Sequence, residues 1–135
     1  MAEITDAGAP LKSALYEAIS GLGITTYTVR PQASDGADGA VYPHIQIGPV
    51  LFNEWDAKAE NGFDFIARIH TRWRGGSEFP GLQIQGELYR RLHNGDLTID
   101  GFELVLMQRQ LSDVTRLADG SFDGVCEYSG LIEAA

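Results

Sequence analysis

The clearest pattern in the chain is a strict alternation of apolar and charged positions between residues 63 and 74. One set of alternate positions is Phe63, Phe65, Ala67, Ile69, Thr71 and Trp73. The other set is Asp64, Arg68, His70, Arg72 and Arg74, with Ile66 as its apolar exception. Because successive side chains of a strand point to opposite faces, the pattern predicts a strand with one buried face and one charged face. A charged face of this kind is suited to meeting a partner.

Two other segments have apolar residues at intervals of three and four, which predicts a helix in each. The apolar stripe of the first, near residues 10–20, is Leu11, Ala14, Leu15, Ala18, Ile19 and Leu22. The second follows an expected N-cap at Ser77. Its stripe is Ile84, Leu88 and Leu92. Gly81 and Gly86 each weaken this helix by about 1 kcal/mol relative to alanine, so we expect a sheet or a neighbour to pack closely there.

Four further segments have the β-branched and aromatic content that is typical of strands. They are residues 25–30, 41–54, 102–111 and 122–133. Gly48-Pro49 interrupts the second of them, which predicts a bulge or an edge position over part of that strand. Asp119-Gly120 predicts a tight turn before the last strand.

The order helix, strand, strand, strand, helix, strand, strand predicts an α+β fold, with a mixed or antiparallel sheet of four to five strands packed by two helices. A length of 135 residues is near the usual size of one domain, so we expect a single domain over residues 1–135. Residues 31–40 are rich in Gly, Ala, Asp and Ser, which predicts an exposed loop. Residues 53–61 form a polar hairpin tip that is longer than a turn requires, and we expect it to have a function.

Composition limits where the protein acts and what it binds. The longest apolar runs fall far below the ~20 residues that a membrane helix needs, and the first ten residues lack a signal-peptide pattern, so we expect assembly in a cytoplasm and no membrane partner. The net charge of -9 makes loose attraction to nucleic acid improbable, because such binding depends on Lys and Arg neutralising phosphates. An acidic wall would instead suit a passage through which DNA moves without being held.

The sequence contains few residues arranged for chemistry. His44, His70 and His93 are not spaced as a local metal pair, and no phosphate loop, Gly-x-Ser-x-Gly or Cys-x-x-Cys is present. We interpret Cys126 as a small buried apolar residue of a strand. We therefore expect no enzyme activity, no cofactor and no metal. A small hydrolase whose site forms only in the fold is the least favoured alternative.

The arginines admit three interpretations: nucleic-acid contact, a solvated or salt-bridged face, or ion pairs with a neighbouring subunit. The acidic excess of the chain favours the third. Trp55 is a residue type favoured at interface anchors, or it folds back onto its own sheet. The expected subunit or ring interface comprises Trp55, Asp56, Lys58, Glu60, Arg68, Arg72, Arg74, Arg90 and Arg91.

Four segments together resemble one protein family. They are Tyr42-Pro43-His44-Ile45-Gln46-Ile47-Gly48, Ala67-Arg68-Ile69-His70-Thr71-Arg72-Trp73, Leu88 to His93, and Asp119-Gly120 with Gly124 and Tyr128. In order and spacing they resemble the small tail-completion proteins of long-tailed phages and gene transfer agents. The resemblance runs from Leu11 to Ile132, and the segment 31–40 looks longer than is usual for the family.

The resemblance implies a fold and a role. The family is similar to phage tail terminators, α+β subunits whose hexameric ring closes the head-proximal end of the tail tube and joins it to the neck. It therefore implies a structural virion protein whose partners are other copies of itself, the tail tube protein and a neck or head-closure protein, with DNA passing through the lumen. A head-closure or connector component of the neck is the alternative structural role.

Overall fold

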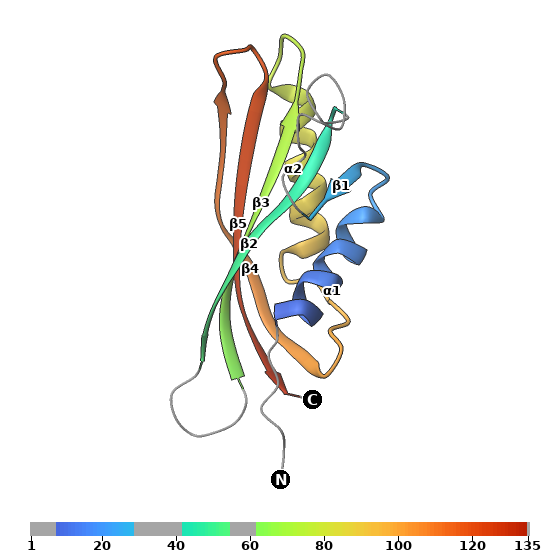
Figure 1. Cartoon of the computed structure of the whole chain (residues 1–135), viewed down its shortest axis with the longest axis vertical. Helices are drawn as coiled ribbons and strands as arrows, with labels where there is room; N and C mark the ends of the chain where they lie inside the picture. Colours follow the sequence, from blue (N-terminus) through green and yellow to red (C-terminus); the bar gives the residue numbers. More distant parts are fainter. Residues whose placement is uncertain (1–7, 29–41, 55–61, 135) are drawn as a thin grey trace.

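The computed structural model describes residues 8–28, 42–54 and 62–134 (Figure 1). Its elements are α1 (Gly8–Ser20), β1 (Thr25–Tyr27), β2 (His44–Glu54), β3 (Gly62–Trp73), α2 (Phe79–Leu92), β4 (Phe102–Arg116) and β5 (Phe122–Ala134). The strands form one sheet in the order β1-β2-β3-β5-β4. β1 is parallel to β2 and all other neighbours are antiparallel. The predicted α+β class, element order and mixed sheet are confirmed.

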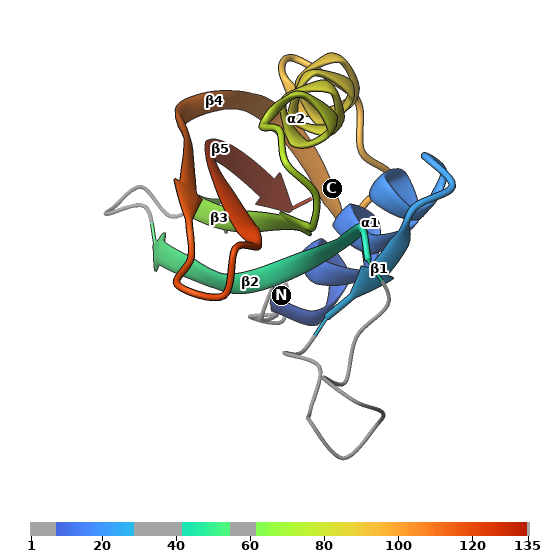
Figure 2. The same ribbon diagram turned by 90° about the horizontal axis from the view of Figure 1, so that it is seen from above.

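Both helices lie on the same face of the sheet, which curves around them (Figure 2). α1 packs against β1 and β2, whereas α2 packs against β3, β4 and β5. The turn between β4 and β5 and the connection from β3 to α2 lie at one end of the sheet, and the ends of β2 and β3 that flank residues 55–61 lie at the other (Figure 1). The opposite face of the sheet, which we call the outer face, carries no helix.

β3 supplies the centre of the core, as its alternation predicted. All six residues of its apolar set are buried, from Phe63 to Trp73. Its register with β5 places Ile69 beside Cys126 and Ala67 beside Tyr128, so the helix-facing sides of the two strands share one core. The predicted stripes of α1 and α2 cover this core through side chains that include Leu15 and Leu88.

The predicted irregularity of β2 is present. The register with β3 shifts between Ile47 and Val50, at Gly48-Pro49. β1 pairs only with residues 44–46 of β2, so among the described residues the rest of β2 is an edge of the sheet. β1 ends at Tyr27, earlier than expected, and residues 29 and 30 of the expected strand lie outside the described residues.

β4 continues to Arg116, five residues beyond the expected end at Leu111. Val114 is the only apolar residue between Leu111 and Arg116, but residues 112–116 still pair with β5 through backbone hydrogen bonds that need no apolar side chain. β4 is an edge strand, and α2 and the turn after it cover part of that edge. The Asn94 amide donates to the Met107 carbonyl (2.7 Å), and the Arg109 amide donates to Nδ1 of His93 (3.1 Å).

The expected N-cap at Ser77 is wrong. α2 begins at Phe79 with Glu78 as its N-cap residue, and Glu78 makes no side-chain capping bond. Ser77 instead belongs to the preceding turn, where its carbonyl accepts the indole N–H of Trp73 (3.0 Å) and its hydroxyl accepts the Phe79 amide (3.1 Å). Pro80 lies in the first turn of the helix, as expected.

The two glycines inside α2 differ in their surroundings. A Cβ at Gly81 would overlap the indole ring of Trp73, which explains that glycine by close packing within the chain. A Cβ at Gly86 would meet no atom of the described residues within 4 Å. The expected close contact therefore exists within the chain at Gly81 and not at Gly86.

We predict opposite effects for alanine at these two positions. Gly81→Ala should lower the free energy of unfolding by about 1–3 kcal/mol, because Trp73 or the helix must move to admit the methyl group. Gly86→Ala should raise it by about 0.5–1 kcal/mol, because alanine is the better helix former and nothing obstructs it. Urea unfolding of both variants measures the difference, and equal effects would contradict the packing described at Trp73.

Candidate interaction surfaces

The charged side chains of β3 lie on the outer face, and most of their partners belong to the same chain. The register pairs Arg68 with Glu127, and the Arg68 guanidinium donates to that carboxylate at 2.5 Å. Asp123 accepts from Nδ1 of His70 (3.1 Å) and lies 3.5 Å from Nε of Arg72. Arg72 also donates to the side-chain carbonyl of Gln46. These contacts form a row of ion pairs and hydrogen bonds across β2, β3 and β5.

The remaining arginines of the expected interface are dispersed. Arg74 lies over the Tyr42 ring, 4.3 Å from its centroid. Arg90 pairs with Glu87 one turn away on α2 (3.1 Å), and Arg91 donates to the Ala18 carbonyl of α1 (3.1 Å). Trp55, Asp56, Lys58 and Glu60 lie outside the described residues. The structure thus places Arg68 and Arg72 on the same face of β3, each beside a different carboxylate of β5, and inter-subunit pairing stays a prediction.

An apolar surface that the sequence analysis missed lies beside the ion pairs on the outer face. Its members, which we call the outer apolar patch, are Leu51, Ile66, Leu106 and Leu111. Leu51 is 62% exposed and Ile66 is 40% exposed. Ile66 contributes to the walls of two hollows, of about 330 and 160 Å³. The signal in the sequence was the single break that Ile66 makes in the charged set of β3.

A second exposed apolar surface follows the solvent side of α2. Phe79 (72% exposed), Leu82 (45%) and Tyr89 (38%) form it, and we call it the α2 ridge. Tyr89 is its partly covered end, because its ring stacks on His93 and the Arg109 guanidinium of β4 lies over it. These residues and Gly86 follow each other at intervals of three and four, so they share one helix face. The sequence shows this spacing, but the buried stripe of the same helix, from Ile84 to Leu92, dominates the pattern.

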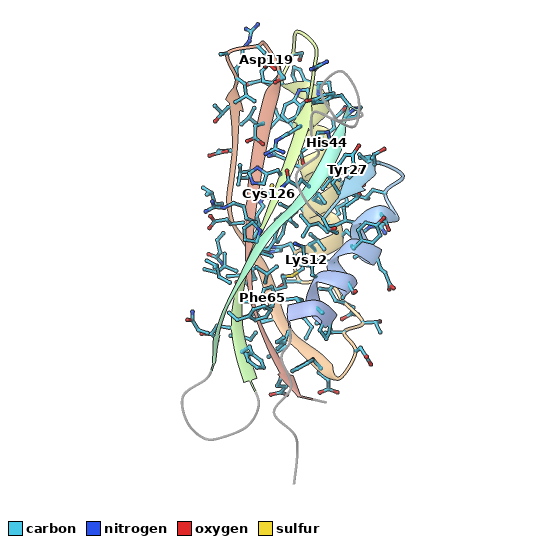
Figure 3. The ribbon with its side chains drawn as sticks, viewed as in Figure 1. Lys12, Tyr27, His44, Phe65, Asp119 and Cys126 are labelled. Carbon is cyan, nitrogen blue, oxygen red and sulfur yellow. The ribbon has the colours of Figure 1, made fainter. Side chains whose placement is uncertain are left out.

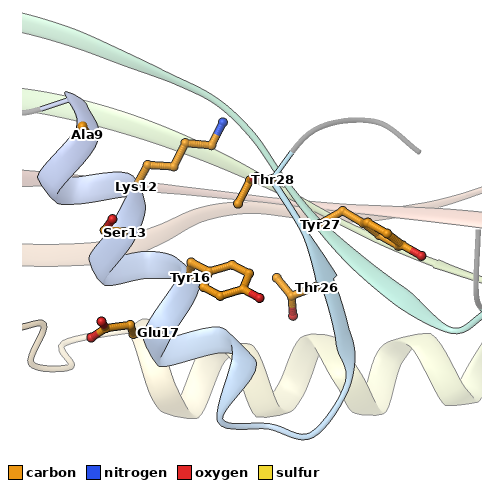
Figure 4. A pocket seen from close by; sticks show the side chains of 8 residues that line it. All are labelled: Ala9, Lys12, Ser13, Tyr16, Glu17, Thr26, Tyr27 and Thr28. Carbon is orange, nitrogen blue, oxygen red and sulfur yellow. The ribbon is translucent and has the colours of Figure 1, made fainter. Parts of the chain in front are cut away.

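An open groove of about 700 Å³ lies between α1 and β1 (Figure 4). Lys12 and Tyr16 extend across it from α1 toward Thr26 and Thr28 (Figure 4). The lining residues are Ala9, Lys12, Ser13, Tyr16, Glu17, Thr26, Tyr27 and Thr28. They combine hydroxyl groups with one cation and one carboxylate, a mixed set that does not specify one ligand chemistry.

Residues capable of chemistry are spread along the sheet. Asp119 lies at the β4–β5 turn and Cys126 in the middle of β5 (Figure 3). The register places Gln46 and Val125 beside His70, and neither is a nucleophile. Among the described residues no group of three or more His, Cys, Asp or Glu could hold a metal ion, and no helix there is long and apolar enough to cross a membrane.

Comparisons with known proteins relate the chain to others through its fold. No family model and no curated protein matches the sequence. A chain in a solved structure titled "Virion of native gene transfer agent (GTA) particle" is similar, with a TM-score of 0.79 and 15% identity. The similarity covers 96% of this chain and 100% of that chain. At this identity it shows that the two chains share a fold.

Burial raises the pKa of the Cys126 thiol, because a thiolate would lose its hydration inside the core. We predict that maleimide and iodoacetamide leave Cys126 unmodified in the folded protein and modify it fully in urea, because the thiolate is the reactive species. Mass spectrometry after a timed reaction measures the modified fraction. Rapid labelling of the native protein at neutral pH would contradict this environment.

The β4–β5 turn holds a carboxylate with a lowered pKa. The Ser121 hydroxyl (2.6 Å) and the Ser121 amide (2.9 Å) both donate to Asp119, and these bonds lower its pKa because they favour the charged form. A lowered pKa in the folded state means that Asp119 stabilises the fold above its unfolded pKa and loses this effect as the pH falls through the folded value.

We predict that Ser121→Ala raises the pKa of Asp119 toward its ordinary value, because the hydroxyl bond is lost and only the amide bond remains. NMR titration of the Asp119 side-chain carboxyl carbon in both proteins measures the shift. Ser13→Ala, which removes an exposed hydroxyl of α1, is the control. An unchanged Asp119 titration in Ser121→Ala would overturn the assignment.

Proposed function

We propose that this chain is a structural subunit of a phage-like virion, and that it forms the hexameric ring that terminates the tail tube and joins it to the neck. The observation that carries the proposal is the fold, which a subunit of a gene transfer agent virion shares over 96% of this chain and over its own whole length. The family resemblance of the sequence points to the same class. As a ring subunit, the chain would need surfaces for its neighbours and no active site.

The charge of the chain supports a lumen through which DNA passes without being held. Six copies of a chain with a net charge of -9 would carry a charge on the order of -50, so the mean field around a central passage would repel DNA. Arg68 and Arg72 contact carboxylates of β5, so a phosphate would have to displace Glu127 or Asp123 to reach them. This arrangement favours a structural role for these two arginines over phosphate binding.

The proposed neighbours along the tail are the tail tube protein on one side and a neck or head-closure protein on the other. The hairpin tip between β2 and β3, residues 53–61, is our candidate for contact with an adjoining ring, because its sequence is polar, is longer than a turn requires and includes Trp55. The site of action would be the head-proximal end of the tail, after assembly in the cytoplasm of the host. In this role the protein has no catalytic function and no cofactor.

We predict that deleting the gene yields tails of uncontrolled length, or tails and filled heads that do not join, because an unterminated tube has no end on which the neck can assemble. Electron microscopy of the lysate measures tail length and joining. Complementation with the wild-type gene is the control. Normal particles from the deletion would overturn the proposal, and tail-free heads that carry this protein would favour the connector role instead.

A further inference from the structure

The two exposed apolar surfaces lie on opposite sides of the molecule. The α2 ridge lies on the side of the sheet that the helices cover, whereas the outer apolar patch lies on the face that carries no helix. Two such surfaces on one chain can be buried together only when they belong to different copies. A contact of this kind joins unlike surfaces and closes into a ring when the rotation between copies permits.

Gly86 provides a reason for close approach at the α2 ridge. It lies between Leu82 and Tyr89 on the same helix face, so its missing side chain leaves a notch in the ridge. Nothing in the described part of the chain fills the space above Gly86, so packing there does not explain a residue that weakens the helix. A side chain of a neighbouring copy that enters the notch would explain it. Leu51 and Ile66 of the outer apolar patch have suitable size and exposure.

The charges around the two surfaces are complementary. The last turn of α2 carries Arg90 and Arg91. On the outer face, carboxylates outnumber arginines. The outward-facing carboxylates of the described strands are Asp64, Glu103, Asp113, Asp123, Glu127 and Glu133, and the outward-facing arginines are Arg68 and Arg72. Arg91 donates to the Ala18 carbonyl, and Arg90 pairs with Glu87 on the helix surface, where both side chains are exposed. Arg90 can therefore exchange Glu87 for a carboxylate of a neighbouring outer face, an option that a contact between two outer faces does not offer.

We propose that adjacent subunits of the ring meet front to back, with the α2 ridge of one copy packed on the outer apolar patch of the next and Gly86 receiving a side chain of that patch. The inference rests on the proposed function. It adds which surfaces meet in the ring, and it names a second copy of this chain as the partner. Apolar contact supplies the attraction at the centre, and Arg90 with the carboxylates of the outer face forms the rim.

Engineered cysteines test the pairing directly. Leu82→Cys and Ile66→Cys are expressed as separate full-length proteins, mixed, and treated with a short bis-maleimide. Buried Cys126 is present in every sample, so the wild-type protein measures its background reaction. We expect a cross-linked pair in the mixture, and none in either variant alone. The double variant should give a ladder of products up to six subunits. Ile66→Cys mixed with Thr98→Cys, an exposed position outside the ridge, is the matched control.

The outcomes separate the interface from the proposed function. The front-to-back contact is overturned if hexamers form but Leu82→Cys and Ile66→Cys do not cross-link, or cross-link no better than the Thr98→Cys control. That outcome leaves the ring role intact. Cross-linking of either variant with itself indicates a twofold pair and overturns the contact. Absence of the protein from purified virions overturns the proposed function and the inference together.

A glycine substitution gives a second, independent test. Gly86→Gln should raise the melting temperature of the isolated chain by a few degrees, because the helix gains a better former in open space. The same substitution should weaken ring assembly at least tenfold, because it fills the notch. Gly76→Gln, at an open position just before α2, should leave assembly unchanged. Full assembly of Gly86→Gln, measured by light scattering across a concentration series, would overturn the role of the notch.

Discussion

The register between β3 and β5 is the constraint on which the rest of the structure depends. Every residue of β3 from Gly62 to Trp73 has a partner in β5, so these strands fix the two faces of the sheet together. A slip of one residue would turn Arg68 and Arg72 into the core and Ile69 toward the outer face. The cost of burying two unpaired guanidinium groups would exceed the few kcal/mol of stability that a domain of this size has. Burial therefore specifies this register strongly.

The same register determines how charge is distributed on the outer face. It sets Arg68 opposite Glu127 and Arg72 opposite Asp123, so the arginines that look like a free basic row in the sequence are paired across strands. Exposed pairs of this type contribute only ~0.2–1 kcal/mol each, so their main effect is on which charges remain available to a partner. The apolar side chains beside these ion pairs, including Leu51 and Ile66, stay exposed and are not covered by other described residues.

The periodicity of apolar residues predicted both helices and β3 well, because burial of an apolar face determines where these elements form. It failed where backbone hydrogen bonds or tertiary contacts determine the bounds of an element. β4 continues past Leu111 because β5 is long enough to pair with it. The N-cap of α2 falls at Glu78, one residue after Ser77, although the Ser77 hydroxyl still accepts the Phe79 amide as a capping side chain does. The partners of the arginines could not be predicted, since the sequence alone did not show that β5 lies beside β3 rather than at an edge. Four of the expected interface residues, from Trp55 to Glu60, lie outside the described residues.

The state of the sheet edges explains why copies of this chain would associate through their faces rather than through their edges. An exposed edge strand ordinarily invites another chain to extend the sheet. Here the Met107 carbonyl and the Arg109 amide of β4 are bonded to Asn94 and His93, and the Asp113 carbonyl accepts from Gln85 of α2 (3.0 Å). At the other edge, β1 offers only three residues, and β2 beyond residue 46 is interrupted by the bulge at Gly48-Pro49. With one edge partly occupied and the other irregular, the α2 ridge and the outer apolar patch are the areas more suited to contact with another copy. Because these two areas face opposite ways, their pairing would propagate in one direction around a ring, as a tail-terminating subunit requires.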